Sequence, residues 1–195
     1  GNTTKSRFIL SAYKHIQDGD YEMLTVRALA QENGYSVAAL YKHFESLKYL
    51  LVVASVKFLD EYMALYTDLL DGSKGTLEIF VEGWNAFIDC AFKRPDVFYR
   101  LFWETDQEEL EHAFIDYYGT FPDEDPNLTA VKFSVFVLPD NPKIRDVSIL
   151  KSIVKYGLMD ADCIDFISST NELIASGLVR RAISADDEER ELLRE

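Results

Sequence analysis

One short stretch of this chain combines residue types that can recognise another macromolecule. The nine residues SVAALYKHF, Ser36–Phe44, place small side chains, a phenol, an amine and an imidazole at helical spacing. At about 100° per residue, Leu40 and Phe44 fall on one face of a helix and Lys42 lies roughly opposite. The chemistry that this pattern favours is non-covalent, with hydrogen bonds and charge contacts along one narrow helix face.

The outer face of this helix has the features of a groove-binding surface. Ala38 and Ala39 lack bulk, so the helix can approach base edges in the major groove of DNA. Tyr41 and His43 flank that face, where a hydroxyl and an imidazole N–H reach the phosphates on the two walls. Lys42 suits a base or a phosphate. The alternative is an ordinary surface helix with an amphipathic tyrosine packed at its edge.

The segments before this helix have their own start and stop signals. Thr25 is the expected N-cap of a short helix over Val26–Glu32. Asn33-Gly34 is a typical helix end, because glycine adopts the left-handed conformation readily. Ser36 then caps the next helix. A further amphipathic helix precedes both, between residues 3 and 20. Two helices joined by a tight turn containing glycine predict a helix-turn-helix.

Charge is distributed unevenly along the chain. The formal net charge is -14, yet residues 1–50 carry six Lys/Arg against five Asp/Glu, and the remaining residues carry 14 against 29. A polyanion is therefore repelled everywhere except at the first fifty residues. The alternative is that the N-terminal part merely lacks acidic residues.

Composition places the chain among ordinary globular proteins. Of its 195 residues, 48% are hydrophobic and 28% charged, and no apolar run is long enough to span a bilayer. Without a signal peptide we expect a cytoplasmic protein with no membrane partner. Cys90 and Cys163 lack metal-ligand spacing, so we expect buried free thiols, no metal and no cofactor. We expect no enzyme, because no nucleophile elbow, phosphate loop or zinc motif occurs.

The stretch Leu24–Leu51 resembles the DNA-binding segment of the tetracycline-repressor (TetR) family of bacterial transcriptional regulators. A capped helix, a glycine turn, a serine-led helix and a Tyr-x-His-Phe ending carry the resemblance. The residues that match are Thr25, Ala30, Gly34, Ser36, Leu40, Tyr41, His43, Phe44 and Leu50. The resemblance implies phosphate contacts by Thr25, Arg27, Ser36, Tyr41 and His43. It implies that the bases are faced by Val37, Ala38, Ala39 and Lys42.

One position departs from the family pattern. The family usually has a lysine near the start of the fourth helix, where this chain has Leu47, and Lys48 follows one place later. Lys48 remains a candidate phosphate contact, because the helix that begins after Ser46 offers backbone N–H groups and a dipole that favour an anion.

These patterns predict an all-α chain with two domains. Residues 1–45 form the helix-turn-helix DNA-binding domain, and residues 46–195 form a helical ligand-binding and dimerisation domain. An unbroken connecting helix is expected over residues 46–70, followed by a break at Asp71–Gly75. The remaining helices, between residues 76 and 183, include an ambiguous apolar segment at Lys132–Leu138 and two last helices at 145–158 and 160–183.

Two further sites are expected in the second domain. The resemblance implies a cavity between helices, and its lining candidates are Trp84, Phe87, Phe98, Phe102 and Trp103, although an aromatic stripe is also typical of a core. Glu82 and Asp89 are candidates to balance a cationic compound. Small residues let helices approach closely, and the family dimerises through its last two long helices. The interface candidates are Gly157, Ser168, Ser169, Ala175, Ser176 and Gly177, although this seam also suits an intramolecular contact.

The function that follows is ligand-responsive transcriptional regulation, with repression as the expected mode. A homodimer would bind a palindromic operator on double-stranded DNA, and a bulky, partly apolar effector of unknown identity would release it. The alternative is a helical small-molecule-binding or interaction protein that has lost specific DNA binding.

Overall fold

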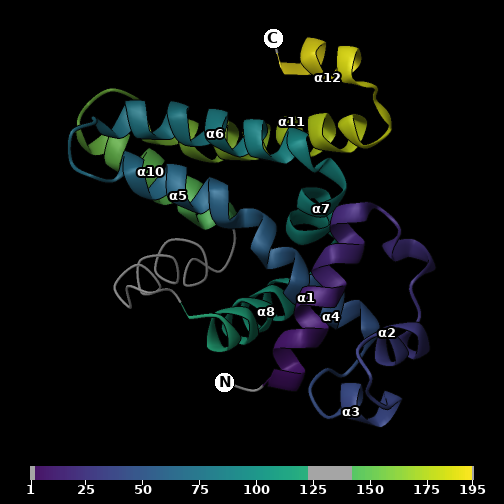
Figure 1. Ribbon diagram of the computed structural model, residues 1–195. Helices are drawn as coiled ribbons and strands as arrows, with labels where there is room; N and C mark the ends of the chain where they lie inside the picture. Colours follow the sequence, from purple (N-terminus) through teal and green to yellow (C-terminus); the bar gives the residue numbers. More distant parts are fainter. Residues whose placement is uncertain (1–2, 123–141, 195) are drawn as a thin grey trace. The chain divides into compact units, whose positions relative to one another are not determined.

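The computed structural model describes residues 3–122 and 142–194, and every regular element within them is a helix. The all-α prediction is therefore confirmed. Contacts divide the chain into two compact units. Of the described residues, unit 1 comprises 3–58 and 105–122, and unit 2 comprises 59–104 and 142–194 (Figure 1). The helix predicted for Lys132–Leu138 lies outside the described residues.

Unit 1 contains the predicted helix-turn-helix. Its elements are α1 (Thr3–Asp18), the 3-10 turn η1 (Tyr21–Met23), α2 (Val26–Glu32), α3 (Val37–Tyr41), α4 (Leu47–Ser55) and α8 (Gln107–Thr120). The i, i+4, i+8 spacing of Phe8, Ala12 and Ile16 gives α1 one apolar face, and all three side chains are buried. That face packs against α4, and α4 also packs against α8 (Figure 1).

One carboxylate of helix α8 bonds to both α1 and α4. Oδ1 of Asp116 lies 2.5 Å from Nζ of Lys5 on α1, and the hydroxyl of Tyr49 on α4 donates to Oδ2 at 2.8 Å. Burial, followed by the Asp116 carboxylate, raises the pKa of Tyr49, so the phenol keeps its proton and remains a donor. The sequence predicts a domain boundary at residue 46, whereas the compact units divide between Phe58 and Leu59 and unit 1 includes α8.

The connecting helix predicted as unbroken over residues 46–70 is interrupted. It consists of α4, a 3-10 segment η2 (Val56–Leu59) and α5 (Asp60–Leu69). The Ser55 hydroxyl donates to the carbonyl of Leu51 at 2.7 Å, a side-chain bond that bends helices because it competes for the backbone acceptor. The next N–H, that of Val56, bonds to Val53, which is the tighter 3-10 pattern.

Unit 2 is a set of helices that enclose an aromatic core. Besides α5 it contains α6 (Thr76–Lys93), α7 (Pro95–Tyr99), the π-helical turn η3 (Arg100–Glu104), α10 (Pro142–Lys155), η5 (Ala161–Cys163), α11 (Ile164–Ser184) and α12 (Asp187–Arg194). Helices α5, α10 and α11 pack against α6 (Figure 1). At Gly83 an added Cβ would lie 2.9 Å from the Tyr66 ring, so the glycine permits the close approach of α5 and α6.

Candidate nucleic-acid interface

The turn between α2 and α3 is built by the residues that the sequence singled out. The hydroxyl of Thr25 accepts from the N–H of Ala28 at 3.1 Å, and that of Ser36 accepts from Ala39 at 3.2 Å. Gly34 has φ +71°, and the next N–H, that of Tyr35, bonds back to the carbonyl of Ala30. Local capping therefore fixes where α3 begins.

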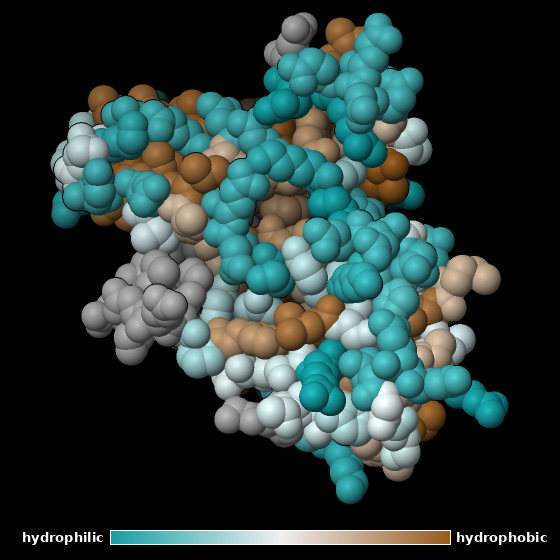
Figure 2. Space-filling view, viewed as in Figure 1, coloured by the Kyte–Doolittle hydropathy of each residue, from teal (hydrophilic) through white to brown (hydrophobic). Residues whose placement is uncertain are grey.

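The exposed face of α3 is the predicted groove-binding face. Val37 is 38% exposed and Tyr41 52% exposed, whereas Leu40 is fully buried. Ala38 and Lys42 are exposed, so four of the predicted contact side chains are accessible together. In Figure 2 the surface at the α3 end is mostly pale, of intermediate hydropathy, with hydrophilic side chains projecting from it.

Two details of α3 differ from the expected helix over Ser36–Phe44. The α-helix ends at Tyr41, although Lys42 keeps helical dihedral angles and Phe44 N–H still bonds to the carbonyl of Leu40 at 3.0 Å. His43 is half-buried, with its ring centroid 6.3 Å from that of Phe44, and Ala39 is also half-buried. These two side chains therefore lie at the edge of the exposed face.

The lysines of unit 1 are not equally accessible to an anion. Lys5 is paired with Asp116, and Lys48 lies 3.6 Å from a carboxylate oxygen of Glu109 on α8. Among the residues that the structure describes, Arg27 and Lys42 are exposed and have no ion pair. Helix α8 thus neutralises two cations of the helix-turn-helix, an effect that sequence spacing did not reveal.

A wide, acidic concavity lies beside the Lys48–Glu109 pair. Its volume is about 680 Å³. The residues that line it include Glu45, Lys48, Tyr49, Asp106, Glu108, Glu109, His112 and Asp116. Because carboxylates predominate in its lining, this concavity disfavours a phosphate backbone.

The five predicted pocket residues gather in unit 2 around one ring. The centroid of Phe87 lies 5.8 Å from Trp84, 5.7 Å from Phe98, 5.1 Å from Phe102 and 6.0 Å from Trp103, at edge-to-face angles. Phe87 and Phe98 are buried, and the other three are half-buried. The cluster therefore serves as core and also reaches the surface.

The cavity beside this cluster is small. It measures about 20 Å³, room for about one water molecule, and Trp84, Phe87, Gly83 and Asp146 are among its lining residues. Nε1 of Trp84 donates to the buried Asp146 carboxylate at 2.9 Å. Sequence patterns did not single out Asp146, because one aspartate in a helix resembles a solvated residue until its neighbours are known.

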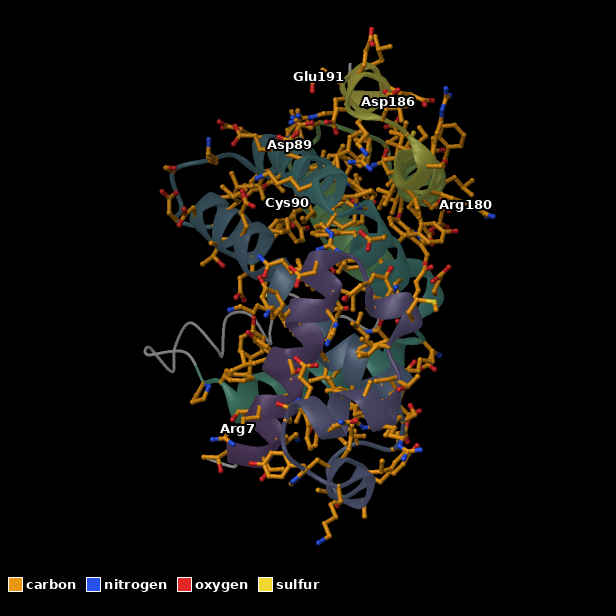
Figure 3. All side chains as sticks on the ribbon, turned by 45° about the vertical axis from the view of Figure 1, so that its right-hand side comes forward. Arg7, Asp89, Cys90, Arg180, Asp186 and Glu191 are labelled. Atoms are coloured by element: carbon orange, nitrogen blue, oxygen red, sulfur yellow. The ribbon has the colours of Figure 1, made fainter. Side chains whose placement is uncertain are left out.

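The two acidic candidates on α6 do not line this cavity. Glu82 pairs with Lys74 at 3.1 Å, and Asp89, labelled in Figure 3, pairs with Arg194 of α12. Both carboxylates therefore already have a cationic partner at the surface of unit 2.

The small residues predicted to form a dimer interface differ in their exposure. Ser168 and Ala175 are buried within the chain, Ser169 and Ser176 are half-buried, and Gly177 is exposed. Gly157 is exposed and follows the end of α10 with φ +70°. The large exposed hydrophobic side chains of α11 are Phe166, Leu173, Ile174 and Ile183.

The remaining reactive groups among the described residues include two thiols. Both cysteines are free thiols, Cys90 buried and Cys163 half-buried, and burial raises the pKa of Cys90 to about 11. In the described ranges, no group of three or more His, Cys, Asp or Glu residues is arranged to hold a metal ion. No described helix is long and apolar enough to cross a membrane.

The fold and this site define an all-helical protein with an N-terminal helix-turn-helix module for binding DNA. Residues 9–52 match the family model described as bacterial regulatory proteins, tetR family. The N-terminal part of the chain therefore carries the DNA-binding domain of this family, which implies a DNA-binding transcriptional regulator. No curated protein matches the chain.

Proposed function

We propose that this regulator is a ligand-responsive repressor that binds a palindromic operator as a homodimer in the cytoplasm. The observation that carries the proposal is the α3 face, where Val37, Ala38 and Lys42 are exposed on a helix fixed by two caps. A face of small side chains approaches base edges closely, and one amine at its end supplies a hydrogen-bond donor.

The phosphate contacts are proposed to surround that face. Thr25 and Ser36 use their hydroxyl oxygens as acceptors for capping, so each O–H remains a donor for a phosphate oxygen. Arg27 and Tyr41 are exposed, and His43 lies at the edge. In this proposal, Val37, Ala38, Ala39 and Lys42 face the bases, and Lys48 contacts phosphate only when Glu109 releases it.

The homodimer is proposed because one short recognition helix contacts only a few base pairs. Two such helices about 34–36 Å apart match successive major grooves of a palindrome. Phe166, Leu173 and Ile174 follow i, i+7, i+8 spacing on α11 and are 73%, 73% and 55% exposed. We propose that a second copy covers this apolar face, with the exposed Gly177 and the half-buried Ser169 and Ser176 beside it.

The effector site is proposed at the aromatic cluster around Phe87. As it stands, the neighbouring cavity holds about one water molecule, so a bulky, partly apolar ligand must displace the half-buried rings of Trp84, Phe102 or Trp103. Displacement in the 46–195 regulatory domain would be transmitted to the 1–45 DNA-binding domain along the α4–η2–α5 run. A coupling of about 1–3 kcal/mol between ligand and operator is typical of such systems.

A mobility-shift assay tests the proposed function. The DNA upstream of the chain's own coding region and a scrambled duplex of equal length are titrated between 50 and 200 mM salt, over which phosphate contacts lose affinity steeply, by roughly 10³-fold or more for a site with six contacts. We expect preferential binding of the upstream duplex. Equal, weak binding to both duplexes would favour the second candidate, a helical small-molecule-binding or interaction protein without specific DNA binding. The pairing of Lys5 and Lys48 with α8 carboxylates is the observation that supports this second candidate.

A further inference from the structure

The cations of unit 1 differ in what surrounds them. Lys5 and Lys48 are paired with carboxylates of α8, and Lys57 lies over the ring of Tyr13. Within the described part of the chain, Arg7, Lys14, Arg27 and Lys42 have no ion pair. Lys14 is close enough to Glu32 to help lower the pKa of that carboxyl, whereas a cation without a neutralising neighbour retains its full attraction for phosphate, so Arg7, Arg27 and Lys42 are the residues that most favour the approach of a polyanion to unit 1.

Arg7 is the member of this set that the family pattern did not point to. It is exposed on α1, and its guanidinium donates to the hydroxyl of Tyr35 at 3.4 Å. The partner is neutral, so the bond orients the guanidinium without cancelling its charge. Arginine has five N–H donors, and among the described residues only this one side-chain bond engages them.

Tyr35 is itself held in place. Its ring centroid lies 5.5 Å from that of Phe8 on α1, and its N–H bonds to the carbonyl of Ala30 at 2.9 Å. It directly precedes Ser36, the N-cap of α3. The Arg7–Tyr35 bond therefore links the guanidinium to the residue that directly precedes the N-cap of α3.

The pictures agree with this placement. In Figure 1 the N-terminal end of α1 lies at the same end of unit 1 as α3, and Figure 3 labels Arg7 at that end of α1. The Arg7 side chain points away from the body of α1 in Figure 3. An anion bound beside α3 at this end of unit 1 would therefore meet a guanidinium that has no carboxylate partner among the described residues.

We propose that Arg7 is a further DNA phosphate contact, oriented by Tyr35, at the flank of the recognition helix. This inference rests on the proposed DNA binding. A planar guanidinium suits a phosphate because two parallel N–H groups can donate to two of its oxygens. Tyr35 is a positioning residue, since it acts through Arg7.

The test uses the full chain and a labelled duplex of random sequence, because phosphate contacts do not depend on sequence. Fluorescence anisotropy gives the association constant K at several salt concentrations. For Arg7→Gln we expect the slope of log K against log salt to fall by about 0.9 for each protomer on the duplex. Lys14→Gln, which removes an equal charge from the same helix, is the control and should change the slope by less than half as much. Arg7 is exposed, so thermal unfolding should match that of the unchanged protein.

Tyr35→Phe separates positioning from charge. It keeps Arg7 and its charge, so the salt slope should stay while affinity falls by less than in Arg7→Gln. If the unchanged protein binds the duplex and Arg7→Gln has the same slope, Arg7 makes no phosphate contact. An equal loss of slope in Lys14→Gln would also overturn the inference, since net charge would explain it. If the unchanged protein binds no duplex at 50 mM salt, the proposed function itself fails.

Discussion

The imidazole of His15 lies between two carboxylates, with Nε2 2.7 Å from Oε2 of Glu32 and Nδ1 2.8 Å from Oδ1 of Asp20. Only the imidazolium has a donor on both nitrogens, so both bonds exist together only when His15 is protonated. The bond to Glu32, aided by that to Asp20, raises the pKa of His15 against the opposing effect of burial. The contact joins the end of α1 to the end of α2 beside the helix-turn-helix turn.

This arrangement makes the stability of unit 1 depend on pH. Because the folded-state pKa of His15 is raised above its usual 6.5, its contribution is complete below pH 6.5 and is lost as the pH rises through the folded-state pKa. The bond from His15 lowers the pKa of Glu32 below 4.5, so the pair also weakens as the pH falls through that lowered value. His15→Gln should therefore cost on the order of 1 kcal/mol near pH 5.5 and less near pH 8.5.

Urea denaturation at the two pH values measures this difference. His112→Gln is the matched control, because His112 is exposed on α8 and has no ion pair among the described residues. A cost for His15→Gln that is the same at both pH values would mean that the imidazolium does not hold the two carboxylates.

Gly34 permits a second stability test. Nothing lies within 4 Å of a Cβ added there, so Gly34→Ala meets no clash and its cost comes only from φ +71°. We expect a loss of about 1–2 kcal/mol in the free energy of unfolding. Gly119→Ala is the control in α8, where space is also open and φ is ordinary, and it should stabilise by about 0.5 kcal/mol. If Gly34→Ala and Gly119→Ala changed the thermal stability equally, the left-handed conformation of Gly34 would not require glycine.

The helix-turn-helix was predictable because its determinants are local. Thr25, Ser36 and Ser46 each cap the helix that follows within three residues, and Gly34 ends a helix through its own backbone conformation. Signals of this kind lie within a few positions of the structure that they specify, so one sequence is enough to recognise them.

The association of α8 with unit 1 was not predictable in the same way. Lys5 and Asp116 are 111 positions apart. The helical periodicity of a segment indicates which of its faces is buried but not which other helix packs against that face. The break in the connecting helix after Ser55 was not predicted for a different reason. A serine within a helical pattern is compatible with an unbroken helix until its hydroxyl is seen to bond to the carbonyl four residues earlier.

Ala38 tests whether α3 enters a groove. Ala38 is exposed, so Ala38→Leu should leave the fold intact but keep α3 away from the bases, at a cost in operator affinity of about 1–3 kcal/mol. Binding to a duplex selected from a random library is compared with binding to a scrambled duplex. Ala64→Leu, at an exposed position of α5, should change neither affinity. Retained preference in Ala38→Leu would show that α3 does not approach the bases there.

The aromatic cluster permits a direct test of ligand binding. The chain has two tryptophans, Trp84 and Trp103, and both contact Phe87, so tryptophan fluorescence, excited at a wavelength that tyrosine does not absorb, reports on the cluster. We expect 1-aminoanthracene, a bulky and partly apolar probe, to quench this emission saturably. Phe102→Ala should change the apparent dissociation constant, whereas Leu77→Ala, at an exposed position of α6, should not. Quenching that rises linearly with probe concentration, without saturation, would show that the probe does not bind a specific site at the cluster.

The pair between Lys48 and Glu109 predicts a gain of DNA affinity. The Lys48 side chain is 69% exposed and that of Glu109 15% exposed, so the lysine can leave the pair more readily than the carboxylate can. Glu109→Gln removes the competing anion. If Lys48 then binds phosphate, affinity for a random duplex rises and the slope of log K against log salt steepens by about 0.9 for each protomer.

Glu111→Gln is the control for this prediction, because it removes the same charge from α8 at a residue that is not paired with Lys48. A general relief of acidic repulsion would raise affinity equally in both variants. The double change Glu109→Gln with Lys48→Gln should cancel the gain, since the freed cation is then absent. A gain that persists in the double variant would locate the effect in the acidic concavity and leave Lys48 outside the DNA contact.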